Sequence, residues 1–154
     1  MGDLPHARSF RELIVYQKQR KLALEVFQIS RRFPAEEKFS LTDQLRRACR
    51  SIGAQIAEAW AKRRYEKHFV AKLTDADAEQ QETQHWILSA HDCGYLSREE
   101  TRPLLRSCAE IGRMLQGMIE SAASFCQDST NPSLREEPVL YYRSLSTDEL
   151  DTDH

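Results

Sequence analysis

The stretch from Gln44 to Trp60 places its apolar residues three and four positions apart, the spacing of one face of an α-helix. Arginines occupy positions 46, 47 and 50, away from that face. A helix of this kind packs one side against the rest of the protein and presents positive charge on another. A cationic helix face can meet nucleic acid, an acidic protein or only water, so the stretch constrains the function without deciding it.

The same spacing of apolar residues extends over most of the chain, and only five glycines and five prolines interrupt its 154 residues. Helices are expected at residues 9–33, 40–64, 65–96 and 97–125. Short links between successive helices make neighbouring helices antiparallel. The sequence therefore predicts an all-α fold, an antiparallel up-down-up-down four-helix bundle.

Local signals support these boundaries. Ser9 and Ser97 each open a Ser-x-x-Glu pattern, which is the sequence of a capping box at a helix N-terminus. Pro34 forces the residue before it out of helical geometry, and Gly94 is a favoured residue just past a helix end. Pro103 falls in an early turn of the last helix, where proline disrupts least.

The chain divides into a mildly basic body and an acidic tail. Residues 1–126 carry a net charge of +3, whereas residues 127–154 contain two arginines and seven acidic residues. The body, residues 1–126, is expected to be a single four-helix domain. The tail is polar apart from a short apolar island at 138–142, a composition typical of a segment that orders only on a partner. The alternative is a disordered remnant.

Nothing in the sequence predicts an enzyme, a metal or a cofactor. The four cysteines have no paired spacing, and no run of 18 apolar residues occurs, so we expect a cytoplasmic protein that does not cross a membrane. Glu82 and His85 have the Glu-x-x-His spacing of di-iron bundles, but such a site needs two of these motifs and the chain has one.

A basic segment is the main candidate for ligand binding. Between residues 41 and 72 there are eight Lys/Arg and three acidic residues, with aromatic residues among them. Cations hold phosphates and aromatic rings stack on bases, so the segment predicts nucleic-acid binding. The candidate residues are Arg46, Arg50, Trp60, Lys62, Arg63, Arg64, Lys67 and Lys72. The alternative is that these charges are only solvated. Arg47 is set apart as a structural ion-pair partner of Glu58.

The first helix carries two apolar stripes. One contains Leu13, Tyr16, Leu24 and Phe27; the other contains Val15, Leu22, Val26, Ile29 and Phe33. A helix on the outside of a bundle needs only one apolar stripe, so the second stripe is interpreted as an interface between subunits of a homo-oligomer. The alternative is a helix sunk deep in its own bundle.

Several short motifs together resemble a known family. They comprise Gln44-x-Arg46-Arg47-Ala48-x-x-Ser51-Ile52, Ile56-Ala57-Glu58, Phe33-Pro34, Glu82-Thr83-Gln84-His85-Trp86, Ala90 and Gly94-Tyr95-Leu96. Taken together in their order along the chain, over residues 10–122, these motifs resemble the bacterial four-helix-bundle proteins called 23S rRNA intervening-sequence proteins. The chain departs from the family pattern at Gln55, where Asn is usual, and at Ala59, where Gly is usual.

The resemblance implies a homo-oligomer, a pentameric ring of antiparallel bundles. A related group is similar to the accessory proteins of diversity-generating retroelements, which are basic pentameric barrels that bind a reverse transcriptase and nucleic acid. The expected function is therefore that of a non-enzymatic scaffold whose basic surface binds RNA or single-stranded DNA, a reverse transcriptase, or both. The alternative is a protein–protein interaction scaffold that binds no nucleic acid.

Overall fold

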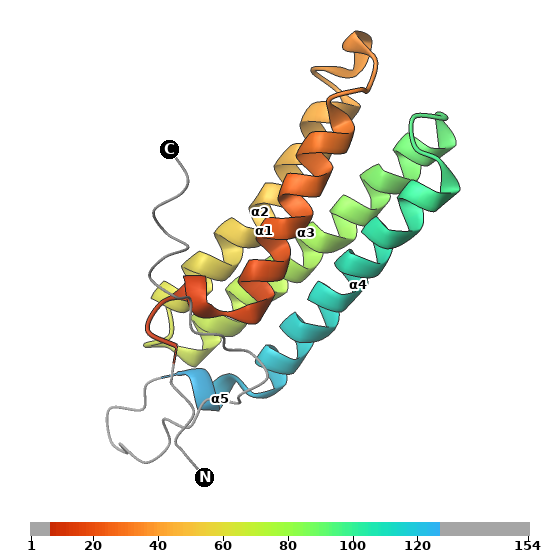
Figure 1. Cartoon of the computed structure of the whole chain (residues 1–154). Coiled ribbons are helices and arrows are strands. Elements are labelled where there is room, and N and C mark those ends of the chain that lie inside the picture. Colours follow the sequence, from red (N-terminus) through yellow and green to blue (C-terminus); the bar gives the residue numbers. More distant parts are fainter. Residues whose placement is uncertain (1–6, 127–154) are drawn as a thin grey trace, which may run out of the picture.

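Four long helices run alternately up and down in the computed structural model, which describes residues 7–126 (Figure 1). They are α1 (Ile14–Ser30), α2 (Leu41–Ala61), α3 (Glu66–Asp92) and α4 (Arg98–Glu120), followed by the short helix α5 (Ala122–Phe125). Two 3₁₀ turns, η1 (Phe10–Glu12) and η2 (Ala35–Glu37), precede α1 and α2. The predicted all-α antiparallel bundle is confirmed. The tail predicted at 127–154 lies outside the described residues.

The core lies along the axis of the bundle and takes residues from every long helix. Large side chains that are less than 2% exposed include Leu22, Ile52, Phe69 and Leu115. Burying one such side chain stabilises the fold by about 1.5–3 kcal/mol. Phe69 also stacks on Phe125, with ring centroids 5.7 Å apart, so α5 closes the end of the core beside the start of α3.

The two predicted capping boxes have different outcomes. Ser97 and Glu100 form a complete box at the start of α4, in which each side chain accepts a hydrogen bond from the other residue's backbone N–H. At the start of the chain, Ser9 accepts from the N–H of Arg11, but the carboxylate of Glu12 accepts from Arg8. Residues 10–12 form a 3₁₀ turn there, so the reciprocal contact of an α-helical box is not made.

The predicted helix boundaries are also corrected in two places. Leu13 has an extended backbone, with ψ of 127°, so α1 begins at Ile14. The second helix ends at Ala61 rather than at Arg64, because the chain turns between α2 and α3. Gly94 ends the α3 region as predicted, with a φ of +78° that glycine adopts without strain.

Two buried glutamines mark places where helix pairs approach closely. Gln19 of α1 is 4% exposed, and its Nε2 donates to the carbonyl of Cys49 in α2 at 2.9 Å. The Gln19 side chain lies directly over Gly53. A Cβ atom added to Gly53 would stand 2.3 Å from Oε1 of Gln19. Gln80 of α3 lies over Gly112 of α4 in the same way, at 2.8 Å from such a Cβ. Each glycine therefore gives space to a polar side chain between two helices.

The α1–α2 link (residues 31–40) and the α3–α4 link (residues 93–97) contact each other at the end of the bundle away from η1 and α5. Arg32 of the α1–α2 link forms an ion pair with Glu100 and donates to the carbonyl of Tyr95. The Tyr95 hydroxyl donates to Glu37 at 3.2 Å, and its ring lies 5.6 Å from that of Phe33. Glu37 also accepts from the N–H of Leu41 and so caps the start of α2. These contacts tie both links together.

The structure reverses the roles predicted for the two apolar stripes of the first helix. Val15, Leu22 and Val26 are at most 1% exposed, Phe33 is 8% exposed, and Ile29 packs against the same core. These five residues thus form the face that α1 buries in its own bundle, not a subunit interface. In the other stripe, Leu24 and Phe27 are 56% and 37% exposed. The large exposed apolar side chains of α1 are therefore in that stripe.

Among residues 7–126, none of the helices has the combination of length and apolar composition that crossing a lipid bilayer requires.

Candidate nucleic-acid interface

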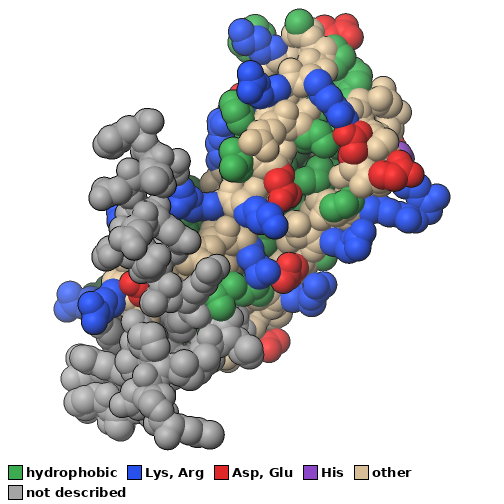
Figure 2. Space-filling model, viewed as in Figure 1, with side chains coloured by type: hydrophobic (Ala, Val, Ile, Leu, Met, Phe, Trp, Pro, Cys, Tyr) green, Lys and Arg blue, Asp and Glu red, His purple; other side chains and the backbone are tan. Residues whose placement is uncertain are grey.

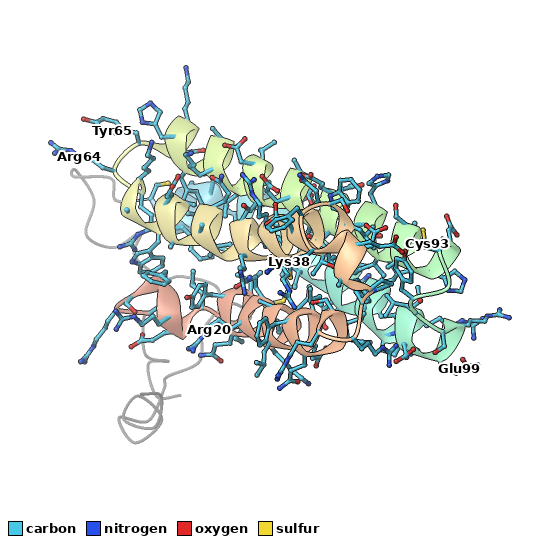
Figure 3. All side chains as sticks on the ribbon, turned by 90° about the horizontal axis from the view of Figure 1, so that it is seen from above. Arg20, Lys38, Arg64, Tyr65, Cys93 and Glu99 are labelled. Carbon is cyan, nitrogen blue, oxygen red and sulfur yellow. The ribbon has the colours of Figure 1, made fainter. Side chains whose placement is uncertain are left out.

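The turn between α2 and α3 gathers most of the predicted nucleic-acid-binding residues at one end of the bundle. The turn is tight: the N–H of Lys62 bonds to the carbonyls of Glu58 and Ala59, and the N–H of Tyr65 bonds to Lys62. Figure 3 shows Arg64 and Tyr65 projecting away from the end of the bundle. We call the following residues the turn cluster: Trp60, Lys62, Arg63, Arg64, Tyr65, Lys67 and His68.

Cations and aromatic rings are in contact within the turn cluster. The guanidinium of Arg63 lies 3.4 Å from the centroid of the Trp60 ring, and its Nε donates to the Trp60 carbonyl at 3.0 Å. The guanidinium of Arg64 lies 5.8 Å from the ring centroid of Tyr65, which in turn lies 5.3 Å from that of His68. Tyr65 is 56% exposed. The cluster thus offers an exposed ring and several cations side by side.

The charge at this end is strongly positive. η1 lies at the same end as the α2–α3 turn (Figure 1), so Arg8 and Arg11 add to the basic residues of the turn cluster. Within 8–12 and 62–68 together there are six Lys/Arg and two acidic residues. By contrast, the face along α1 and α4 mixes both signs of charge (Figure 2). The η1 end therefore attracts anionic ligands.

Arg46 and Arg50 do not belong to this cluster. Arg46 donates to the Ser30 hydroxyl at 2.8 Å and to the Phe27 carbonyl at 3.4 Å. The guanidinium groups of Arg46 and Arg50 lie 4.8 and 5.9 Å from the centroid of the Phe27 ring. Since α2 rises about 1.5 Å per residue, Arg46 is about 20 Å along the helix from Trp60. These two arginines face α1 and form a different surface.

Lys72 is engaged within the subunit. Its Nζ lies 2.9 Å from the carboxylate of Glu58 and 3.8 Å from that of Asp75, and it donates to Gln55 at 3.4 Å. Its hydrogen bond with Glu58 is the main cause that raises the pKa of Lys72, and the same bond lowers the pKa of Glu58. Lys72, one of the eight predicted binding residues, is thus held in an ion pair inside the subunit.

The predicted ion pair between Arg47 and Glu58 is wrong. Arg47 lies 3.9 Å from Asp43, one turn earlier on α2, while Glu58 pairs with Lys72 of α3. Eleven residues separate Arg47 from Glu58 on the same helix, which places them about 16 Å apart along its axis. Sharing a face of one helix does not bring two side chains into contact at that separation.

The groups considered for chemistry do not converge. Residues 7–126 contain no group of three or more His, Cys, Asp or Glu side chains that could hold a metal ion. Glu82 accepts a hydrogen bond from Trp86 at 3.2 Å rather than facing His85. Cys49 and Cys108 are buried, and burial raises the pKa of each thiol to about 12, so neither forms a thiolate near neutral pH.

Two surface features lie outside the residues that the sequence singled out for binding. Tyr65 is the exposed ring of the turn cluster, and its position between basic residues was the available signal. Phe27 is exposed under two arginines of α2. Its place in one of two apolar stripes was visible in the sequence, but the contact with α2 depends on how the helices pack.

The described part of the chain is thus an all-α helical bundle with a cationic, aromatic end. Residues 11–117 match the model of the 23S rRNA-intervening sequence protein family, and the chain belongs to that family. It is also similar to a solved structure from Bacteroides thetaiotaomicron, described as a protein with unknown function from the S23 ribosomal protein family. The two share 26% identity, with a TM-score of 0.64, over 70% of this chain and 99% of that one. No curated protein matches the chain.

Proposed function

We propose that this protein is a non-enzymatic, homo-oligomeric scaffold that binds nucleic acid through the turn cluster. The observation that carries the proposal is the exposed Tyr65 ring flanked by Lys62, Arg64 and Lys67, at the end of the bundle where positive charge is concentrated. The cluster combines the two groups that single-stranded nucleic acid engages, cations for its phosphates and an aromatic face for its bases.

The expected binding is electrostatic with a stacking component. Each phosphate neutralised on a single strand adds about −0.7 to the slope of log affinity against log salt concentration. Contacts from Lys62, Arg64 and Lys67 would together contribute about −2 to that slope. Stacking of one base on Tyr65 adds about 1–3 kcal/mol. One subunit therefore binds weakly, and useful affinity requires several copies.

Self-association supplies those copies. The exposed Leu24 and Phe27 of α1 support it, because large apolar side chains that face solvent on one helix are typical of an interaction surface. The resemblance to pentameric ring proteins favours five subunits. In a cyclic assembly, symmetry places every turn cluster at the same height around the axis, so a single strand could contact several of them. The same resemblance makes a reverse transcriptase the candidate protein partner.

Fluorescence anisotropy with a labelled single-stranded DNA and, separately, a labelled RNA hairpin tests the proposal. We expect the triple variant Lys62→Glu/Arg64→Glu/Lys67→Glu to lose at least about a hundredfold in affinity and most of the salt dependence. The matched control is Arg102→Glu/Arg106→Glu/Arg113→Glu, which changes the charge equally at exposed positions of α4. Equal losses in both variants, or no loss in the first, would show that the turn cluster is not the binding site.

A scaffold for proteins alone is the second candidate. The observation that favours it is that Arg46 and Lys72 make contacts inside the subunit. In that case the oligomer forms, but neither nucleic acid binds with a salt-dependent affinity. The anisotropy titration and a measurement of molar mass on the same sample separate the two candidates.

A further inference from the structure

A groove runs along the outer surface between α1 and α2. It consists of two hollows of about 320 and 300 Å³ that share Ala23 and Arg50 in their lining. Tyr16 lines one hollow, and Leu24 and Phe27 line the other. We call this surface the α1–α2 groove.

The α1–α2 groove is lined by both apolar and basic side chains. Arg20 and Arg50 line it, and no Asp or Glu is among the residues lining either hollow. Arg46 lies beside it, held over the Phe27 ring by its hydrogen bonds to Ser30 and to the Phe27 carbonyl. An occupant that fits this surface must therefore offer both apolar and acidic side chains.

A surface that offers both apolar and acidic side chains lies along α3, on the other side of α2. Asp75, Glu79, Glu82 and Trp86 follow one another at steps of four, three and four residues and thus share one stripe of the helix. Lys72, one turn earlier, contacts Gln55 and Glu58, which shows that this stripe flanks α2 on the side away from α1. We call these four residues the α3 stripe.

The carboxylates of the α3 stripe are poorly balanced within the subunit. Partial burial is the main cause that raises the pKa of Glu79, and the nearby charges of Glu82 and Asp75 raise it further. Lys72 lies 3.8 Å from Asp75 but makes its shorter contact with Glu58. Trp86 is half-buried, and its Nε1 donates to Glu82. Cations from outside the subunit would relieve this repulsion.

We infer that the α1–α2 groove of one subunit receives the α3 stripe of a second copy of the chain. Arg20, Arg46 and Arg50 then face the three carboxylates, while Trp86 meets Leu24 and Phe27. The inference rests on the proposed self-association and names the two surfaces that carry it. Because the surfaces differ, the contact is head-to-tail, and such contacts close into a ring when the rotation permits.

The dimensions of the two surfaces agree. Tyr16 and Phe27 are eleven residues apart on α1, and Asp75 and Trp86 are eleven residues apart on α3, so each surface extends over about 16 Å. Opposite charges arranged in this way also disfavour the wrong pairings, since groove against groove places arginines together. A second copy of the chain therefore satisfies both surfaces at once.

Multi-angle light scattering after size-exclusion chromatography tests this contact with a charge swap. We expect the wild-type chain to be an oligomer and both Glu79→Arg/Glu82→Arg and Arg20→Glu/Arg50→Glu to be monomers. The variant that combines all four substitutions should recover the oligomer, because attraction is restored with its sign reversed. The matched control, Glu99→Arg/Glu120→Arg, alters two exposed carboxylates of α4 and should keep the wild-type mass. Circular dichroism verifies that every variant is helical.

The possible outcomes separate the inference from the proposed function. A monomeric wild-type chain overturns both. An oligomer whose mass is unchanged in Glu79→Arg/Glu82→Arg overturns only the inference, as does an oligomer that the four combined substitutions fail to restore. If the charge variants keep their mass and truncation after Cys126 dissociates the oligomer, the C-terminal segment is the occupant and the inference is wrong.

Discussion

Replacing Gly53 by alanine tests how closely α1 and α2 pack. The new Cβ would stand 2.3 Å from Oε1 and 2.8 Å from Cδ of Gln19, closer than unbonded atoms can approach. Gln19 has little room to move away, because it is 4% exposed and its amide donates to the Cys49 carbonyl. The substitution therefore either displaces that amide from its hydrogen bond or moves the two helices apart.

The expected change in stability follows from two opposing effects. Displacing a buried amide from its partner costs about 1–3 kcal/mol. Alanine in a helix interior is favoured over glycine by about 1 kcal/mol. The net effect of Gly53→Ala is a destabilisation of up to about 2 kcal/mol. In a Gln19→Ala background the obstructing side chain is absent, so the same substitution should stabilise the protein by about 1 kcal/mol.

Urea unfolding of the four proteins in this double-mutant cycle measures both values, with helicity followed by circular dichroism. All four must be compared at one protein concentration, because association would add to the apparent stability. The sign of the Gly53→Ala effect should reverse when the Gln19 side chain is removed. An effect of the same sign and size in both backgrounds would refute the steric argument.

Two further predictions concern titration and thiol reactivity. The ion pair with Arg32 is the main cause that lowers the pKa of Glu100 to about 2, below its ordinary value of 4.5. The pair therefore stabilises the fold above about pH 4.5 and loses its effect as the pH falls toward 2. The free energy of unfolding, measured with urea at a series of pH values, should therefore differ less and less between wild type and Glu100→Gln as the pH falls over that range. In native protein at pH 8, a thiol reagent should modify exposed Cys93 rapidly and buried Cys49 and Cys108 only on unfolding; equal rates for all three would contradict their burial.

The sequence predicted the four helices because their apolar periodicity is long and their stop signals are strong. It did not predict which stripe of α1 faces the core. Both stripes contain large apolar residues, and the choice depends on how α1 sits between α2 and α4. Leu13 was also assigned to a helical stripe, although its backbone is extended and it precedes α1.

The candidate site was predicted in composition but not in arrangement. The basic segment was visible as a count of charges, yet it separates into the turn cluster, the arginines over Phe27 and the Lys72 ion pair. The separation arises where α2 ends at Ala61, since Arg64 then leaves the helix that carries Arg46. No glycine or proline marks that turn, so the predicted helix end at Arg64 lay three residues beyond the observed one.

The contact between the two links gives a structural role to two of the motifs that suggested the family, Phe33-Pro34 and Gly94-Tyr95-Leu96. Phe33 and Tyr95 come from motifs about sixty residues apart, and their rings lie 5.6 Å from each other. Arg32 binds the carbonyl of Tyr95, and the Tyr95 hydroxyl binds Glu37, so the first and second helical hairpins are joined there by polar as well as aromatic contacts. These two motifs therefore hold the links together at one end of the bundle, while the turn cluster occupies the opposite end. Likeness at these two motifs is therefore explained by the closure of the fold and does not by itself indicate a ligand.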